Sequence, residues 1–205
     1  MNTERRNNNQ RVRIEKRDGQ PSKIVGYAAV FYRDDDPGTQ YELYSGHFER
    51  IQPGAFTRAL GENDDVRGLF NHEPSAILGR AQAGTLSLSE DDTGLRYEID
   101  VPDTQVGRDV ATSIERGDVT GSSFAFSISE GGSEIRKDGK NTVREINGVA
   151  LYDVGPVTYP AYEATTTGIR AADGIKEARL AFEQFYIDQE SVEVRLRIIA
   201  IDTDS

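Results

Sequence analysis

Two adjacent serines and two histidines are the residues whose chemistry could support a nucleophilic reaction. Ser122 and Ser123 stand in the stretch DVTGSSFAFSISE, residues 118–130. A serine hydroxyl is a weak nucleophile until a neighbouring base takes its proton, and histidine is the side chain best suited to that role near neutral pH. His72 lies where a predicted strand ends, a place where reacting groups are often displayed, whereas His47 lies in a more polar stretch. Either histidine could equally be an ordinary surface residue or a hydrogen-bonded core residue.

The alternation of side chains in residues 119–128 separates the two serines. In a strand, successive side chains point to opposite faces. One face would carry Ser122, Phe124, Phe126 and Ile128, and the other would carry Gly121, Ser123, Ala125 and Ser127. The first face is bulky and belongs in the core, so we expect Ser122 to be packed and Ser123 to be accessible. Small residues that line a sheet contact or a barrel interior would produce the same pattern.

Asp153 is the candidate for a third group that orients the base. It lies in ALYDVGPVTYPAY, where alternation places Leu151 and Val149 on its own face. A carboxylate in such apolar surroundings needs a hydrogen-bond donor, and the Nδ1–H of a histidine is one. An aspartate that caps a turn before Gly155 would have the same sequence signature.

The sequence gives little support to metal, cofactor, nucleic-acid or membrane functions. It contains no cysteine and only two distant histidines, and it lacks the HExxH and Gly-rich nucleotide-binding patterns. The stretch RDDDPGTQYE does not have the spacing of a calcium loop. The net charge of −11 repels phosphate backbones, and no apolar run approaches the roughly 20 residues of a membrane span. We therefore expect no cofactor, no nucleic acid and no membrane.

The elements that must position these residues form a strand-rich pattern. We predict an α+β fold, a β-dominated, barrel-like mixed sheet with peripheral helices. Strands are predicted at 24–32, 41–51, 65–74, 84–102, 119–129, 142–162 and 191–202, with 84–102 forming a hairpin. Helices are predicted at 53–61, 103–118 and 174–189. Residues 1–23 are basic, with a net charge of +4, and rich in Asn and Gln, so we expect a disordered head.

Several stretches together resemble one family. GYAAVFY, ERIQPGAFTRAL, VRGLFNHEPSAILGR, GTLSLSEDDTGLRYEIDVPDTQVGRDV, IERGDVTGSSFAFSI and VALYDVGPVTYPAYEATTTGIR occur in the order found in prohead proteases of tailed bacteriophages. These serine proteases are thought to be related to the herpesvirus assemblins. The resemblance covers residues 24–170 and implies that this range is a protease domain with an assemblin-like fold. Residues 171–205 would then be a C-terminal helix and strand or tail.

The resemblance also implies a role for each candidate residue. Ser123 would be the nucleophile, His72 the general base and Asp153 the third member, although the family usually has Glu at that position. The sequence also departs from the family at Ala125, where Gly is common, and at Ser122, where an apolar residue is common. Gly155 stands where the family commonly has Ser. His47 has no counterpart in the family pattern, which favours a structural role for it.

The implied activity is that of a serine endopeptidase in capsid maturation. Such an enzyme would cleave the scaffolding region of the major capsid protein, and then itself, inside the procapsid in the host cytoplasm. A homodimer is expected, self-cleavage is expected in the head or after residue 170, and the stretch TTTGIR with Arg170 would lie near the oxyanion hole. The alternative is a non-catalytic capsid scaffold or decoration module of the same fold. An esterase-type hydrolase is a further alternative, but the sequence has no GxSxG elbow.

Overall fold

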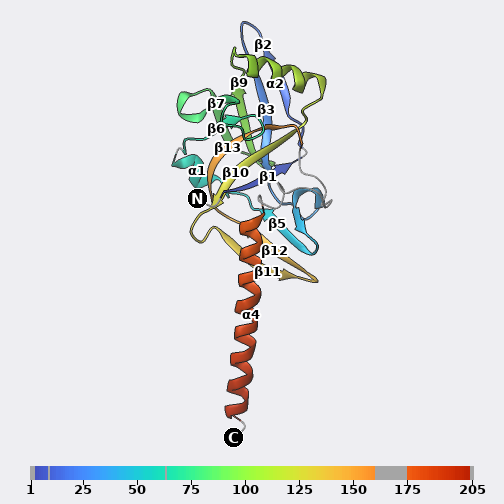
Figure 1. The fold of residues 1–205 in the computed structure, drawn as a ribbon, viewed down its shortest axis with the longest axis vertical. Helices are drawn as coiled ribbons and strands as arrows, with labels where there is room; N and C mark the ends of the chain where they lie inside the picture. Colours follow the sequence, from blue (N-terminus) through green and yellow to red (C-terminus); the bar gives the residue numbers. More distant parts are fainter. Residues whose placement is uncertain (1–2, 9, 63, 160–174, 204–205) are drawn as a thin grey trace.

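Three β-sheets form the body of the protein (Figure 1). The computed structural model describes residues 3–8, 10–62, 64–159 and 175–203. The first sheet has the strand order β1-β10-β13-β6-β7, namely Glu4–Asn8, Gly121–Ile128, Val149–Val157, Arg67–Leu69 and Ile77–Arg80. The second has the order β11-β12-β5-β4, namely Ser133–Asp138, Asn141–Ile146, His47–Ile51 and Tyr41–Tyr44. The third has the order β2-β3-β9-β8, namely Arg13–Arg17, Gln20–Val30, Gly94–Asp100 and Leu86–Glu90.

Helices are few, and most lie at the periphery of the sheets. The described α-helices are α1 (Thr57–Gly61), α2 (Gln105–Arg116) and α4 (Lys176–Thr203), and the 3₁₀ turns are η1 (Pro37–Thr39) and η2 (Ala81–Ala83). The ends of α2 are capped: Thr104 accepts a hydrogen bond from the Gly107 N–H, and Gly117 ends the helix with φ 84°. In the described residues, no helix is long and apolar enough to cross a membrane.

The predicted hairpin is confirmed in its pairing as well as its position. Leu86 pairs with Ile99 and Leu88 pairs with Tyr97, so the apolar residues of β8 and β9 share one face. Asp91 stabilises the turn, because its side chain accepts hydrogen bonds from the backbone N–H groups of Thr93 and Gly94.

The bulky face of β10 packs in the core, as its alternation predicts. Phe124 and Phe126 are fully buried and stack with ring centroids 4.7 Å apart. Phe56, just before α1, meets Phe124 edge-on at 5.5 Å. Aromatic pairs of this kind add about 0.5–1.5 kcal/mol beyond the burial of their area. This cluster anchors β10 in the hydrophobic core.

Three fold predictions need correction. The sheets remain three separate sheets in the described residues and do not close into a barrel. The head is not disordered, since its residues form β1, which pairs with β10, and β2, which pairs with β3. The compositional argument failed because Glu4 and Arg6 are buried and neutralise each other, so their charges do not keep the segment in water.

The predicted final strand, 191–202, is also wrong. This segment belongs to α4, which continues without a break to Thr203 and runs away from the sheets in Figure 1. The alternation of apolar residues there resembles a strand pattern, but neither Gly nor Pro interrupts residues 175–203. A helix that has started adds residues easily, so the absence of a breaker decided the outcome.

Candidate active site

Ser123 lies in the middle of β10, with a neighbouring strand on each side. Its register partners are Asn7 of β1 and Gly155 of β13. The expectation that it is accessible is wrong, because none of its surface is exposed. The expectation for Ser122 is confirmed: it points into the core, and its hydroxyl forms a 2.8 Å hydrogen bond with the Tyr97 hydroxyl.

A β-bulge brings Asp153 to the face of Ser123. Ala125 pairs with Asp153, but the next residue, Phe126, pairs with Leu151, so β13 has one extra residue at this point. The extra residue breaks the alternation of β13. Asp153 therefore shares the face of Ala125 and Ser123, while Leu151 faces the core with Phe126. The sequence expectation that Leu151 and Asp153 share a face is corrected by this bulge.

His72 lies in the turn that joins β6 to β7. β6 runs parallel to β13, with Arg67 opposite Asp153, so the end of β6 delivers the turn next to the site. Asn71 and His72 both have left-handed backbone conformations, with φ of 54° and 59°. Such conformations are costly outside glycine and persist only where surrounding contacts hold them.

Asn71 supplies the contacts that hold this turn. Its side chain donates a hydrogen bond to the Thr158 hydroxyl at 3.0 Å and accepts one from the Thr158 N–H at 2.8 Å. Its backbone N–H donates to the Pro156 carbonyl at 3.1 Å. The turn is thus fastened to the end of β13. The role of Asn71 was not predicted from the sequence, although the tolerance of Asn for left-handed backbone was an available signal.

The three side chains form one continuous row. His72 Nδ1 lies 2.5 Å from Asp153 Oδ1, and His72 Nε2 lies 2.6 Å from Ser123 Oγ. The side chains of His72 and Asp153 are only 9% and 13% exposed, so the row is largely shielded from water. With a proton on Nδ1, the imidazole donates to Asp153 and its Nε2 accepts from the serine. This arrangement can activate a hydroxyl for attack on a carbonyl carbon.

The remaining candidates lie elsewhere or outside the described residues. His47 Nε2 bonds the Tyr186 hydroxyl at 2.9 Å, and its ring stacks on Tyr44, which makes it part of the contact between β5 and α4. The stretch TTTGIR with Arg170, considered for the oxyanion hole, lies outside the described residues. Within the described part of the chain, no three His, Asp or Glu side chains are grouped to hold a metal.

Comparison with known proteins identifies the family. A sequence model described as caudovirus prohead serine protease matches residues 9–178, most of the chain. The chain belongs to the caudovirus prohead serine protease family. Among solved structures, the bacteriophage T4 capsid assembly protease, gp21, matches with a TM-score of 0.43 and 14% identity, over 78% of this chain and 100% of that chain. Nothing among the curated proteins matches.

The range matched by the family model includes all three hydrogen-bonded side chains of the site. Ser123, His72 and Asp153 all lie inside residues 9–178. Strand β1 does not, because it ends at Asn8.

Proposed function

We propose that Ser123, His72 and Asp153 are the catalytic triad of a serine endopeptidase. The enzyme would cleave the scaffolding region of the phage major capsid protein, and itself, during procapsid maturation. The observation that carries this proposal is the unbroken hydrogen-bonded row from Asp153 through His72 to Ser123. Membership in a family of prohead serine proteases supplies the reaction class and the setting.

The chemistry follows from the two hydrogen bonds of His72, one to Asp153 and one to Ser123. Ser123 Oγ attacks the scissile carbonyl carbon while its proton passes to His72 Nε2, and the imidazolium then delivers that proton to the leaving amine. Water attacks the acyl-serine in the same way and releases the second product. Asp153 holds the Nδ1 proton and stabilises the imidazolium. Positioned proton transfer of this kind contributes about 10²–10⁴-fold to the rate.

Aspartate in place of the family's usual glutamate is compatible with this role. The shorter side chain reaches His72 because the bulge turns it toward the row and β6 runs directly beside β13. The resulting contact of 2.5 Å between His72 Nδ1 and Asp153 Oδ1 is a direct hydrogen bond to a carboxylate.

The proposal includes the partners and the setting. The substrate is the major capsid protein with its scaffolding segment, the enzyme acts as a homodimer inside the procapsid in the host cytoplasm, and no cofactor takes part. The protease domain is proposed to be residues 24–170. Family membership supports the capsid setting.

Coexpression with the cognate capsid protein tests the proposed function. The wild-type chain is expected to shorten the capsid protein, as seen by mass spectrometry, and His72→Ala is expected to leave it at full length. His47→Ala is the matched control and should process normally, because His47 lies outside the row. Normal processing by His72→Ala would instead favour the non-catalytic scaffold or decoration module.

Asn71→Ala is expected to slow the reaction of Ser123 with a fluorophosphonate probe by about 10- to 100-fold. The substitution removes both side-chain bonds to Thr158 and places alanine in a left-handed conformation, so His72 shifts from the serine. Displacements of about 1 Å in such groups cost roughly 10²-fold in rate.

Asn71→Gly separates the two causes of that loss. Glycine restores the tolerance for left-handed backbone but not the bonds to Thr158, so its labelling rate should fall between those of wild type and Asn71→Ala. Equal rates for wild type and Asn71→Ala would show that the turn needs no such fastening.

A further inference from the structure

The carboxylate of Asp64 binds the backbone of β13 beside the bulge. Asp64 Oδ2 accepts a hydrogen bond of 3.1 Å from the backbone N–H of Leu151, which is 87 residues away in the sequence. Asp64 lies in the connection between α1 and β6, and its own backbone is held on both sides. Its N–H donates to the Ala59 carbonyl at 3.0 Å, and its carbonyl accepts from the Val66 N–H at 2.8 Å. These bonds keep the carboxylate facing β13.

The bond to Asp64 replaces a strand pairing that β13 lacks at this point. The pairing of β13 with β6 begins at Asp153. Before Asp153, the Val149 N–H donates to the Ala55 carbonyl at 3.2 Å, and the Leu151 N–H donates to Asp64. Leu151 is buried, and a buried N–H without an acceptor costs about 1–3 kcal/mol. The side chain of Asp64 therefore provides the acceptor that a neighbouring strand would otherwise provide.

The bulge that sets the direction of Asp153 comes directly after this bond. Tyr152 is the extra residue, because the residues on either side of it pair with consecutive residues of β10. The Tyr152 hydroxyl shares a hydrogen bond of 2.7 Å with the Ser127 hydroxyl of β10. Without the extra residue, β13 would alternate regularly, and Asp153 would return to the core face with Leu151, away from Ser123.

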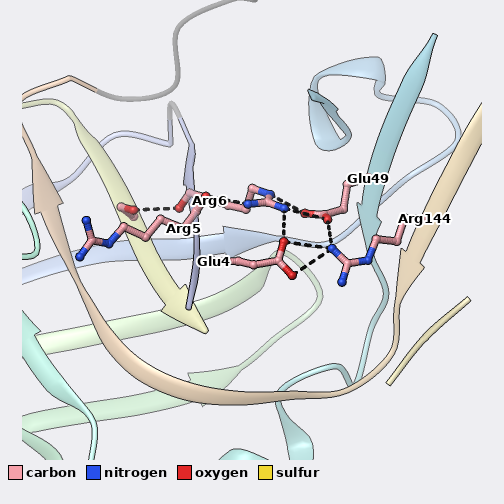
Figure 2. Close-up of polar contacts among 6 residues, drawn as sticks. Glu4, Arg5, Arg6, Glu49 and Arg144 are labelled. Carbon is pink, nitrogen blue, oxygen red and sulfur yellow. Dashed lines mark hydrogen bonds and ion pairs between the residues drawn. The ribbon is translucent and has the colours of Figure 1, made fainter. Parts of the chain in front are cut away.

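The strand that carries Ser123 is held independently of the bulge. Its phenylalanines are part of the hydrophobic core, and β1 pairs along its other edge. Figure 2 shows that Arg6 of β1 binds Glu49 of β5, which ties β1 to the second sheet. The bulge therefore decides where Asp153 stands relative to a serine whose own position is fixed.

We propose that Asp64 is a positioning residue for the reaction, because its bond to Leu151 fixes the bulge that turns Asp153 toward His72. Asp64 acts on the reaction through Asp153 and not by contact with the substrate. The role requires an acceptor oxygen at this place and does not require a negative charge. This inference rests on the proposed function, because it explains how the third member of that triad is oriented.

Substitutions of Asp64 in the full-length chain test the role of the acceptor through the labelling rate of Ser123 with a fluorophosphonate probe. Asp64→Ala removes the acceptor, so we expect labelling about 10- to 100-fold slower than in wild type. Asp64→Asn keeps an acceptor oxygen, and its rate should stay within about threefold of wild type. Asp91→Ala is the matched control, since Asp91 also accepts backbone N–H groups but lies in the turn between β8 and β9. It should label at the wild-type rate.

Asp64→Glu separates the place of the acceptor from its charge. Glutamate keeps the negative charge but moves the carboxylate by one methylene, so the bulge must shift to keep the bond. We expect Asp64→Glu to label more slowly than Asp64→Asn. This comparison stays informative if the alanine variant does not fold.

A double variant shows whether Asp64 acts through Asp153. In the Asp153→Ala background, Asp64→Ala should change the residual labelling rate by less than about twofold, because the side chain that it positions is already absent. A loss caused only by a weaker fold would instead be similar in both backgrounds.

The tautomer of His72 gives a readout that a general loss of stability does not change. The chain has two histidines, so NMR of the ¹⁵N-histidine-labelled protein reports two rings. In wild type the neutral ring of His72 should carry its proton on Nδ1, where Asp153 accepts it. Asp64→Ala should populate the form with the proton on Nε2, and Asp64→Asn should restore the wild-type form. His47 is the internal reference, because its Nδ1 bonds the Ser45 carbonyl at 3.0 Å.

Three results overturn the positioning role while leaving the proposed function intact. The first is an unchanged His72 tautomer in Asp64→Ala, at any labelling rate. The second is labelling of Asp64→Glu as fast as that of Asp64→Asn, or faster. The third is an equal loss from Asp64→Ala with and without Asp153. Absence of labelling in wild type and in every variant contradicts the proposed function itself, and the positioning role with it.

Discussion

Ser123→Ala is expected to lower proteolytic activity by about 10⁶-fold, the loss typical when the nucleophile of such a triad is removed. The alanine cannot form the acyl intermediate, and His72 is left with no proton to accept. Cleavage of the coexpressed capsid protein and labelling by a fluorophosphonate probe should both disappear. The fold should persist, because among the described residues the hydroxyl bonds His72 and the Arg6 carbonyl, and neither bond is part of the core packing.

Ser122→Ala is the matched control, one residue away on the opposite face of β10. It should retain cleavage but lose about 1–3 kcal/mol of stability, because it leaves the buried Tyr97 hydroxyl without its partner. Burial raises the pKa of Tyr97, so its hydroxyl remains a neutral donor that needs an acceptor. Urea unfolding measures this loss. If Ser122→Ala lost cleavage and Ser123→Ala kept it, the assignment of the nucleophile would be reversed.

Gly155→Ala is expected to damage the fold and the site together. A Cβ at this position would lie 2.0 Å from the backbone carbonyl oxygen of Leu69 in β6, and no flexible side chain can move to relieve the clash. The strands β6 and β13 must then separate, which pulls His72 away from Asp153. We expect a loss of about 3 kcal/mol in the free energy of unfolding, the upper end for overpacking.

In Gly155→Ala, the fluorophosphonate probe should label Ser123 at least about 100-fold more slowly than in wild type, because His72 no longer contacts Asp153. Gly61→Ala, at the end of α1, is the control: apart from its chain neighbours and its own helix, no described atom lies within 4 Å of its Cβ position, so stability should change by no more than about 0.5 kcal/mol. Wild-type stability and labelling in Gly155→Ala would mean that β6 and β13 can part without disturbing the site.

Local patterns were sufficient to predict much of the framework. The period of two in β8, β9 and β10 predicted which apolar side chains enter the core and that Ser122 packs there. The caps Thr104 and Gly117 bounded α2. These features depend on residues close in sequence, so a short window contains the physical information that determines them.

The sequence by itself determined the family, the main strands and the three candidate residues, since these are expressed in motifs and alternation. Only the tertiary structure decided how the candidates meet. The bulge in β13 reverses the face of Asp153, and the contacts of Asn71 hold His72 in a conformation that propensity disfavours. Pairing between distant residues also decided that the charged head is buried as β1, because Glu49 and Arg144 supply the opposite charges from 43 to 140 residues away. Composition and periodicity carry no record of such long-range partners.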